Sequence, residues 1–133
     1  ILPLLETPLG ELLLACAQKR LSEQPPIVWK SGASACVVMA AEGYPGPFKK
    51  GERITGIEEA EEQGAIVFHA GTKTKQQVLL TDGGRVLGVT VTDETFDAAL
   101  SKAYTAVNSI QFDGAYYRRD IGDRVRTTES AAS

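Results

Sequence analysis

Hydrophobic and polar positions along the chain alternate between a helical and a strand-like period. Apolar residues recur at helical spacing over residues 9–21, and Thr7 is a suitable N-cap for a helix that begins there. A second stripe of helical period covers residues 96–110, which Asp93 or Thr95 can cap. The pattern therefore predicts two helices, each with one apolar face.

The stretches between these helices favour strands. Residues 34–40 are apolar almost throughout, which is typical of a central strand buried on both faces. Residues 85–92 alternate, so that one face of this strand is more apolar than the other. Further short runs predict strands at residues 27–30, 65–69, 76–80 and 114–118. The fold class that follows is α+β, a small and mostly antiparallel β-sheet with the two helices packed on one side.

Two segments between the predicted elements are irregular or strongly polar. Residues 42–48 contain two glycines and two prolines and predict a loop, which is either a turn or a lid. Residues 57–63 carry four glutamates with no histidine nearby, and they predict a helical turn. Because neighbouring carboxylates repel one another, we interpret this acidic run as a solvated face and not as a metal site.

Composition places the chain among ordinary single-domain proteins. It has 133 residues, 43% hydrophobic and 23% charged, and a net charge of −3, which excludes the basic surface that nucleic-acid binding requires. The apolar start is interrupted by Glu6, Pro8 and Glu11, so that neither a signal peptide nor a membrane span is predicted. We therefore expect that the chain starts inside a larger protein.

The two cysteines indicate a compartment. Cys16 and Cys36 both lie in apolar runs, where a free cysteine behaves as a small buried hydrophobe. Two cysteines and a single histidine are too few for a disulfide framework or for a zinc site built from these residues. We expect both thiols to be buried and the compartment to be reducing, hence cytoplasmic.

Candidate chemistry is concentrated in two glycine-containing segments, residues 68–72 and residues 83–90. Each presents one polar side chain, His69 or Arg85, beside glycines that allow close approach of a ligand to the backbone. The planar guanidinium of Arg85 suits a phosphate or carboxylate. Residues 82–84 also have the sequence of a tight hairpin turn, in which case Arg85 is a solvated charge at the start of a strand.

Four stretches of the chain have an order and spacing that is more specific than any single motif. They read SACVVMAAEGYPG at 34–46, FHAGT at 68–72, GGRVLGVT at 83–90 and YYRRDIG at 116–122. These stretches resemble the C-terminal region of the phosphoribosylamine–glycine ligase family, which belongs to the ATP-grasp ligases. The resemblance extends from residue 1 to about residue 126. It implies an ATP-dependent condensation of 5-phosphoribosylamine with glycine to glycinamide ribonucleotide in de novo purine biosynthesis.

The resemblance also implies how the chain is divided. Residues 1–24 resemble the end of the ATP-grasp domain, including its last helix. Residues 25–126 resemble the C-terminal domain that closes over substrate, and residues 127–133 are expected to form a disordered tail. The family holds ATP and Mg or Mn in residues that precede this region, so we expect this chain alone to bind neither, to contain no catalytic residue and to be inactive. The N-terminal ATP-grasp part of the same protein is the implied partner.

Site residues follow from the resemblance by position. Arg85 and Gly84 fall where related ATP-grasp enzymes of purine synthesis present a basic residue after a glycine turn to the substrate phosphate. His69, Gly71 and Thr72 are candidates for lying close to substrate, although a histidine that donates to a backbone carbonyl fits the same pattern. A different class of function also remains open, a non-catalytic module of the same fold that binds a small molecule or another protein.

Overall fold

The computed structural model describes residues 1–125, so the predicted tail at residues 127–133 lies outside the described residues. Its centre is a four-stranded antiparallel sheet with the strand order β2-β5-β1-β6. The strands are β1 (Ala33–Ala41), β2 (Ile66–His69), β5 (Arg85–Asp93) and β6 (Ala115–Tyr117). The α+β fold class with a mostly antiparallel sheet is confirmed.

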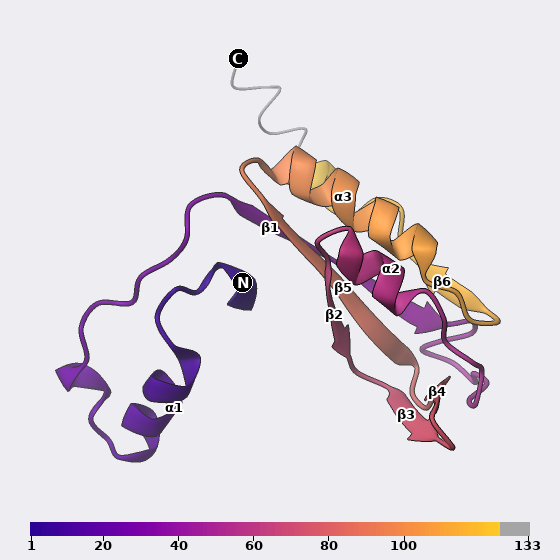
Figure 1. Ribbon diagram of the computed structural model, residues 1–133, viewed down its shortest axis with the longest axis horizontal. Coiled ribbons are helices and arrows are strands. Elements are labelled where there is room, and N and C mark those ends of the chain that lie inside the picture. The colour runs from indigo at the N-terminus through magenta and orange to yellow at the C-terminus, as the bar shows by residue number, and fades with distance from the viewer. Residues whose placement is uncertain (126–133) are drawn as a thin grey trace.

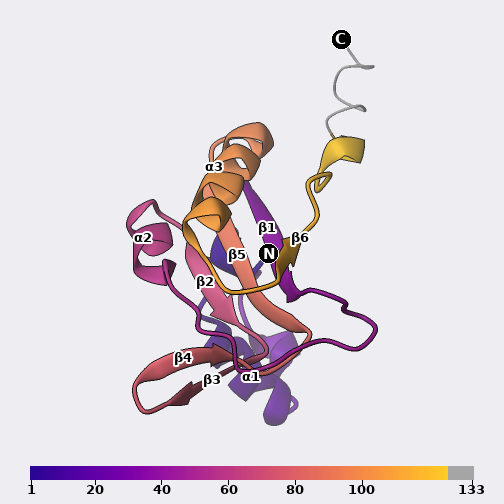
Figure 2. The same cartoon turned by 90° about the vertical axis from the view of Figure 1, so that its right-hand side faces the viewer.

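Two helices cover one face of this sheet, α2 (Ile57–Glu62) and α3 (Phe96–Ser109) (Figure 1 and Figure 2). The Thr95 hydroxyl caps α3 by accepting from the backbone N–H of Ala98 at 3.2 Å, as the sequence predicts. The apolar stripe of α3, which includes Leu100 and Val107, packs on the inward side chains of the central strands and forms the core with them; these side chains include Val37, Met39, Leu87 and Val89. The glutamates of α2 are exposed, which agrees with a solvated face.

A second, two-stranded sheet extends from one end of the first (Figure 1). It contains β3 (Thr72–Lys75) and β4 (Val78–Thr81). The segment before α2 runs beside β4, where the backbone N–H of Ile54 donates to the carbonyl of Leu79 at 2.9 Å. The sequence predicted a strand near β4 but missed β3, since its alternating threonines and lysines offer no apolar signal.

The N-terminal segment differs from the prediction in several respects. The helix α1 (Leu9–Ala17) begins where expected, but Lys19 takes a left-handed conformation (φ 59°) and the helix ends well before residue 21. The cap assigned to Thr7 is wrong, because its hydroxyl instead accepts from the backbone N–H of Val28 at 2.7 Å. The short 3-10 turns η1 (Leu2–Leu4) and η2 (Leu21–Glu23) flank α1.

The prediction that both long helices share one side of the sheet is also wrong. Figure 1 shows α3 and α2 along one side and residues 1–32, with α1, on the other. The predicted strand at residues 27–30 is reduced to one bridge between Leu5 and Trp29. The second helix on the same side as α3 is α2, which the sequence predicted only as a helical turn.

Burial along β1 corrects two further expectations. Its side chains alternate, with Val37 and Met39 buried against the helices and Cys36 and Val38 exposed on the opposite face. The strand is central in the sheet, but helices cover only one of its faces, so it is not buried on both. Both cysteines are exposed, Cys36 for this reason and Cys16 because α1 buries only Leu12 and Ala15.

Candidate functional site

The segment predicted to bind an anion, residues 83–90, begins where the chain passes from the small sheet to the large one. Gly83 and Gly84 join β4 to β5, and these strands belong to different sheets, so residues 82–84 do not form a hairpin turn. Neither glycine has a positive φ. The glycines are therefore required by close packing and not by the conformation of a turn.

One close approach joins the two glycine segments that the sequence singled out. A Cβ atom added to Gly71 would lie 2.5 Å from the Cα of Gly83 and 2.6 Å from the carbonyl oxygen of Arg85. The backbone N–H of Gly71 donates to the carbonyl of Val86 at 3.2 Å, and that of Asp82 donates to Gly71 at 2.7 Å. Segments twelve residues apart in the sequence are thus held in backbone contact, and only glycine fits at this crossing.

The second close approach is between Gly84 and the loop at residues 42–48. A Cβ atom on Gly84 would overlap the ring of Tyr44, and the carbonyl of Gly84 accepts from the backbone N–H of Ala41 at 2.8 Å. The loop contains no helix or strand, as predicted. Tyr44 packs with Phe48 at 6.1 Å between ring centroids, which supports the ring over Gly84.

These approaches border a hollow of about 500 Å³ at the end of the sheet face that the helices leave open. Its lining brings together three predicted site residues, Gly71, Gly84 and Arg85, with the apolar side chains of Val38, Tyr44 and Phe68, among others. A mostly apolar wall with one convergent charge is the usual composition of a small-molecule site. The sequence missed Phe68 as part of this wall, although it precedes His69 in the same motif.

Arg85 is the charged group in this lining, and it is exposed. Asp82, its nearest acidic neighbour in the sequence, is already paired with Lys73 at 3.0 Å, and that hydrogen bond holds the pKa of the Asp82 carboxyl below its usual value. Within residues 1–125 no hydrogen bond or ion pair engages the Arg85 guanidinium. The described residues therefore do not hold Arg85 in a structural ion pair.

His69 and Thr72 are engaged with each other. The His69 Nδ1 lies 3.0 Å from the Thr72 hydroxyl oxygen, and neither residue lines the hollow. Successive side chains of a strand point to opposite faces, so the presence of Phe68 in the wall directs His69 away from it. This contact joins the two side chains across the turn between β2 and β3.

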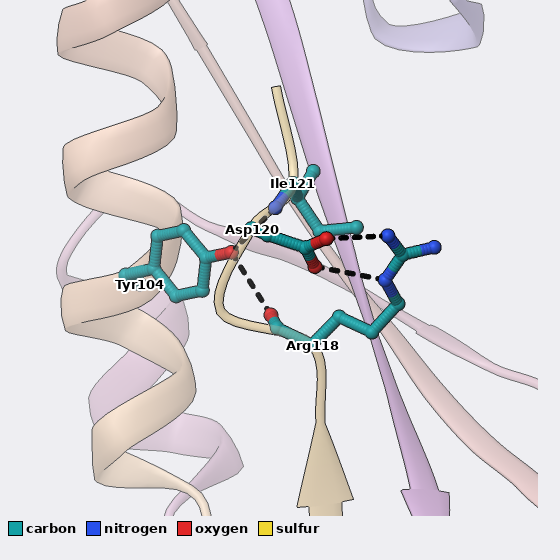
Figure 3. Close-up of polar contacts among 4 residues, drawn as sticks. All are labelled: Tyr104, Arg118, Asp120 and Ile121. Atoms are coloured by element: carbon teal, nitrogen blue, oxygen red, sulfur yellow. Dashed lines mark hydrogen bonds and ion pairs between the residues drawn. The ribbon is translucent and has the colours of Figure 1, made fainter. Parts of the chain in front are cut away.

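A second polar arrangement lies after β6 (Figure 3). The Tyr104 hydroxyl donates to the carbonyl of Arg118 at 2.9 Å and accepts from the backbone N–H of Ile121 at 3.2 Å. Arg118 in turn holds both carboxylate oxygens of Asp120, at 2.8 and 2.6 Å, which lowers the pKa of Asp120. The charges of Arg118 and Asp120 are therefore paired with each other inside the turn that Tyr104 fixes.

Two further features of the described part of the chain concern metal ions and membranes. Among residues 1–125 no three His, Cys, Asp or Glu side chains gather closely enough to hold a metal ion. None of the helices in this range is long and apolar enough to cross a membrane.

Comparison with known proteins identifies the family of the chain. A family model described as the C domain of phosphoribosylglycinamide synthetase matches residues 34–124. A phosphoribosylamine–glycine ligase from Nostoc is 62% identical over 128 residues, which cover 96% of this chain and 30% of the relative. A human trifunctional purine biosynthetic protein, adenosine-3, is 43% identical over 124 residues, 93% of this chain and 12% of its own length.

Solved structures give the same result. The crystal structure of phosphoribosylamine–glycine ligase from Thermotoga maritima superimposes with a TM-score of 0.68 at 36% identity, over 83% of this chain and 27% of that protein. The chain thus spans about 30% of the length of the single-enzyme relatives from Nostoc and Synechocystis. The resemblance seen in the sequence motifs is confirmed, and the chain belongs to the phosphoribosylglycinamide synthetase family, in which it matches the C domain.

Proposed function

We propose that the full-length protein containing this chain is an ATP-dependent carbon–nitrogen ligase. It condenses 5-phosphoribosylamine with glycine to glycinamide ribonucleotide in purine biosynthesis. The relatives named phosphoribosylamine–glycine ligase support this assignment, since up to 96% of the chain aligns with them. A cytoplasmic location is part of the proposal and is supported by two cysteines that are both free.

Within this reaction, the chain binds the substrate phosphate through Arg85. The observation that carries this role is an exposed guanidinium with no protein partner among residues 1–125, placed on the lining of a hollow beside Gly71 and Gly84. Because a guanidinium presents parallel N–H groups, it can hold two phosphate oxygens at once and fix the orientation of the ribose. Gly84 contributes by leaving room for the Tyr44 ring that closes one side of the site.

ATP and its Mg or Mn ion are assigned to the rest of the ligase. Among residues 1–125 no group of three His, Cys, Asp or Glu side chains could hold the ion, in keeping with this assignment. When bound elsewhere in the protein, ATP supplies the activation of the glycine carboxylate. Residues 1–24 are proposed to be the end of the ATP-grasp domain and residues 25–126 the substrate-closing domain. His69, Gly71 and Thr72 remain candidates close to substrate, with Gly71 best placed because it lines the hollow.

The test compares the full-length protein with the 133-residue chain. ADP formation by the full-length protein should require both glycine and phosphoribosylamine, whereas the chain alone should give the rate of a blank. Turnover by the chain alone would contradict the assignment of nucleotide and metal to the remainder. If the full-length protein showed no turnover while the chain bound ribose 5-phosphate, the non-catalytic binding module would be the better description.

A further inference from the structure

A β-bulge in β5 decides on which face of the sheet Arg85 lies. Met39 of β1 pairs with Leu87, and both are buried in the core. The next residue of β1, Ala40, pairs with Arg85, so Val86 is an extra residue with no partner on β1. Paired residues share a face, and in a strand without a bulge Arg85 would lie on the core side with Leu87. The bulge instead buries Val86 completely and leaves Arg85 on the lining of the hollow, on the face opposite α2 and α3.

The backbone before Arg85 is held by Tyr44 and Ala41. A Cβ atom on Gly84 would overlap Cγ, Cδ2 and Cε2 of the Tyr44 ring, so the ring lies directly on this glycine. The Gly84 carbonyl accepts from the backbone N–H of Ala41 at 2.8 Å, and the carbonyl of Ala41 accepts from the backbone N–H of Tyr44 at 3.1 Å. The loop that carries Tyr44 therefore fixes the residue from which the backbone continues to Arg85.

The backbone after Arg85 is held by main-chain groups. The carbonyl of Val86 accepts from the backbone N–H of Ala70 at 3.0 Å and from that of Gly71 at 3.2 Å. Among these contacts on the two sides of Arg85, the Tyr44 ring is the one that a side chain contributes. Within residues 1–125 the Tyr44 hydroxyl forms no hydrogen bond, so the ring itself makes the contact. Substitution of Tyr44 therefore removes one support and leaves the backbone hydrogen bonds in place.

We propose that Tyr44 is a positioning residue, whose ring holds Gly84 and thereby directs the Arg85 guanidinium into the hollow. This inference rests on the proposed function and deepens it, since the directed group is the one assigned to the substrate phosphate. A guanidinium holds two phosphate oxygens only when its plane faces them, and a misplacement of about 1 Å can lower activity about 100-fold. Because a bulge disrupts the regular ladder at Arg85, the ring supplies a constraint that strand pairing alone lacks.

The test is the KM for phosphoribosylamine in the full-length ligase. Tyr44→Ala should raise it about fivefold or more and leave the KM for ATP nearly unchanged, because the backbone before Arg85 loses its support. Tyr44→Phe keeps the ring and should stay within about twofold of the parent. Tyr116→Ala is the matched control, since Tyr116 is 58% exposed and lines a different hollow, at β6; its KM should also stay within about twofold of the parent. The KM does not depend on how much of the enzyme is folded, so a destabilised variant still gives a valid result.

A double-mutant cycle separates positioning from other roles of Tyr44. In the Arg85→Met background, Tyr44→Ala should raise the KM for phosphoribosylamine by less than about twofold, because no guanidinium is left to direct. Equal effects of Tyr44→Ala in the two backgrounds would overturn the proposal, and so would a fall in kcat with an unchanged KM. An equal rise for Tyr44→Phe and Tyr44→Ala would show that the hydroxyl acts and not the ring, and would also overturn it.

Failure of this inference is distinct from failure of the proposed function. If Arg85→Met raised the KM for phosphoribosylamine and Tyr44→Ala did not, the role of Arg85 would stand and only the role of Tyr44 would be wrong. If Arg85→Met left this KM unchanged, the assignment of Arg85 to the substrate phosphate would itself be wrong.

Discussion

Replacement of Arg85 by methionine separates a phosphate-binding arginine from a solvated charge at the start of β5. Methionine keeps much of the apolar stem that packs along the hollow and removes the guanidinium. No hydrogen bond or ion pair within residues 1–125 is lost with it, so the cost to folding should be small. The effect of the substitution should therefore be confined to the substrate.

The magnitude follows from the bonds that a guanidinium makes to a phosphate. Hydrogen bonds to a charged group contribute about 1.5–3 kcal/mol, which corresponds to an approximately 10- to 150-fold weaker interaction with phosphoribosylamine. Because Arg85 is exposed, salt screens part of this attraction, and the effect should be larger at low ionic strength. Arg85→Lys should recover only part of the loss, since lysine keeps the charge but not the planar arrangement of donors.

The assay is steady-state kinetics of the full-length ligase, with each substrate varied in turn. Arg85→Met should raise the KM for phosphoribosylamine and leave the KM for ATP nearly unchanged. Arg53→Met is the matched control, because Arg53 is also exposed but lines a different hollow, near α2 and β4. If Arg85→Met changed the dependence on phosphoribosylamine by less than about twofold, the reasoning from bond energies would be refuted. A loss of thermal stability alone would show that Arg85 is structural.

Three further predictions concern stability. Gly71→Ala should destabilise the chain by about 1–3 kcal/mol in denaturant unfolding, because the added Cβ meets the backbone of Gly83. Gly10→Ala, which adds a Cβ in open space, should instead stabilise α1 by about 0.5–1 kcal/mol, and shifts of the same sign would contradict the packing argument. Tyr104→Phe should cost about 1–3 kcal/mol and speed hydrogen exchange at Ile121, while Tyr116→Phe, 58% exposed, should do neither. Salt bridges lower the pKa of Asp82, Asp93 and Asp120 below 3.8, so each stabilises the fold above that pH and the contribution is lost as pH falls through the lowered values. Asp93→Asn removes the pair with Lys102 and should make acid unfolding, monitored by circular dichroism, less dependent on pH. An unchanged profile would exclude the Asp93–Lys102 pair as a cause.

The elements with a strong local signal could be predicted from the sequence. In α3, the helical period, the Thr95 cap and the apolar stripe all agree, so both ends of the helix were placed to within a residue. The alternation in β5 identified a strand but not one buried side, because Val86 and Thr90 are buried as well as Leu87 and Val89. The glycine segments and Arg85 were recognised by composition and by a family resemblance, and both segments do meet at one end of the sheet.

Only the tertiary structure decided which side chains are buried and which segments touch, because both depend on how the helices and strands pack together. Cys36 and Val38 read as buried because their strand is apolar, yet α2 and α3 cover only the other face. The glycines at 83 and 84 read as a turn, but the constraint on them comes from Gly71 and Tyr44, distant in the chain. Tyr44 and Phe68 likewise join Arg85 at one hollow only in the folded chain. The physical reason is that the periodicity of a sequence predicts the conformation of a segment and does not identify the segments that it contacts.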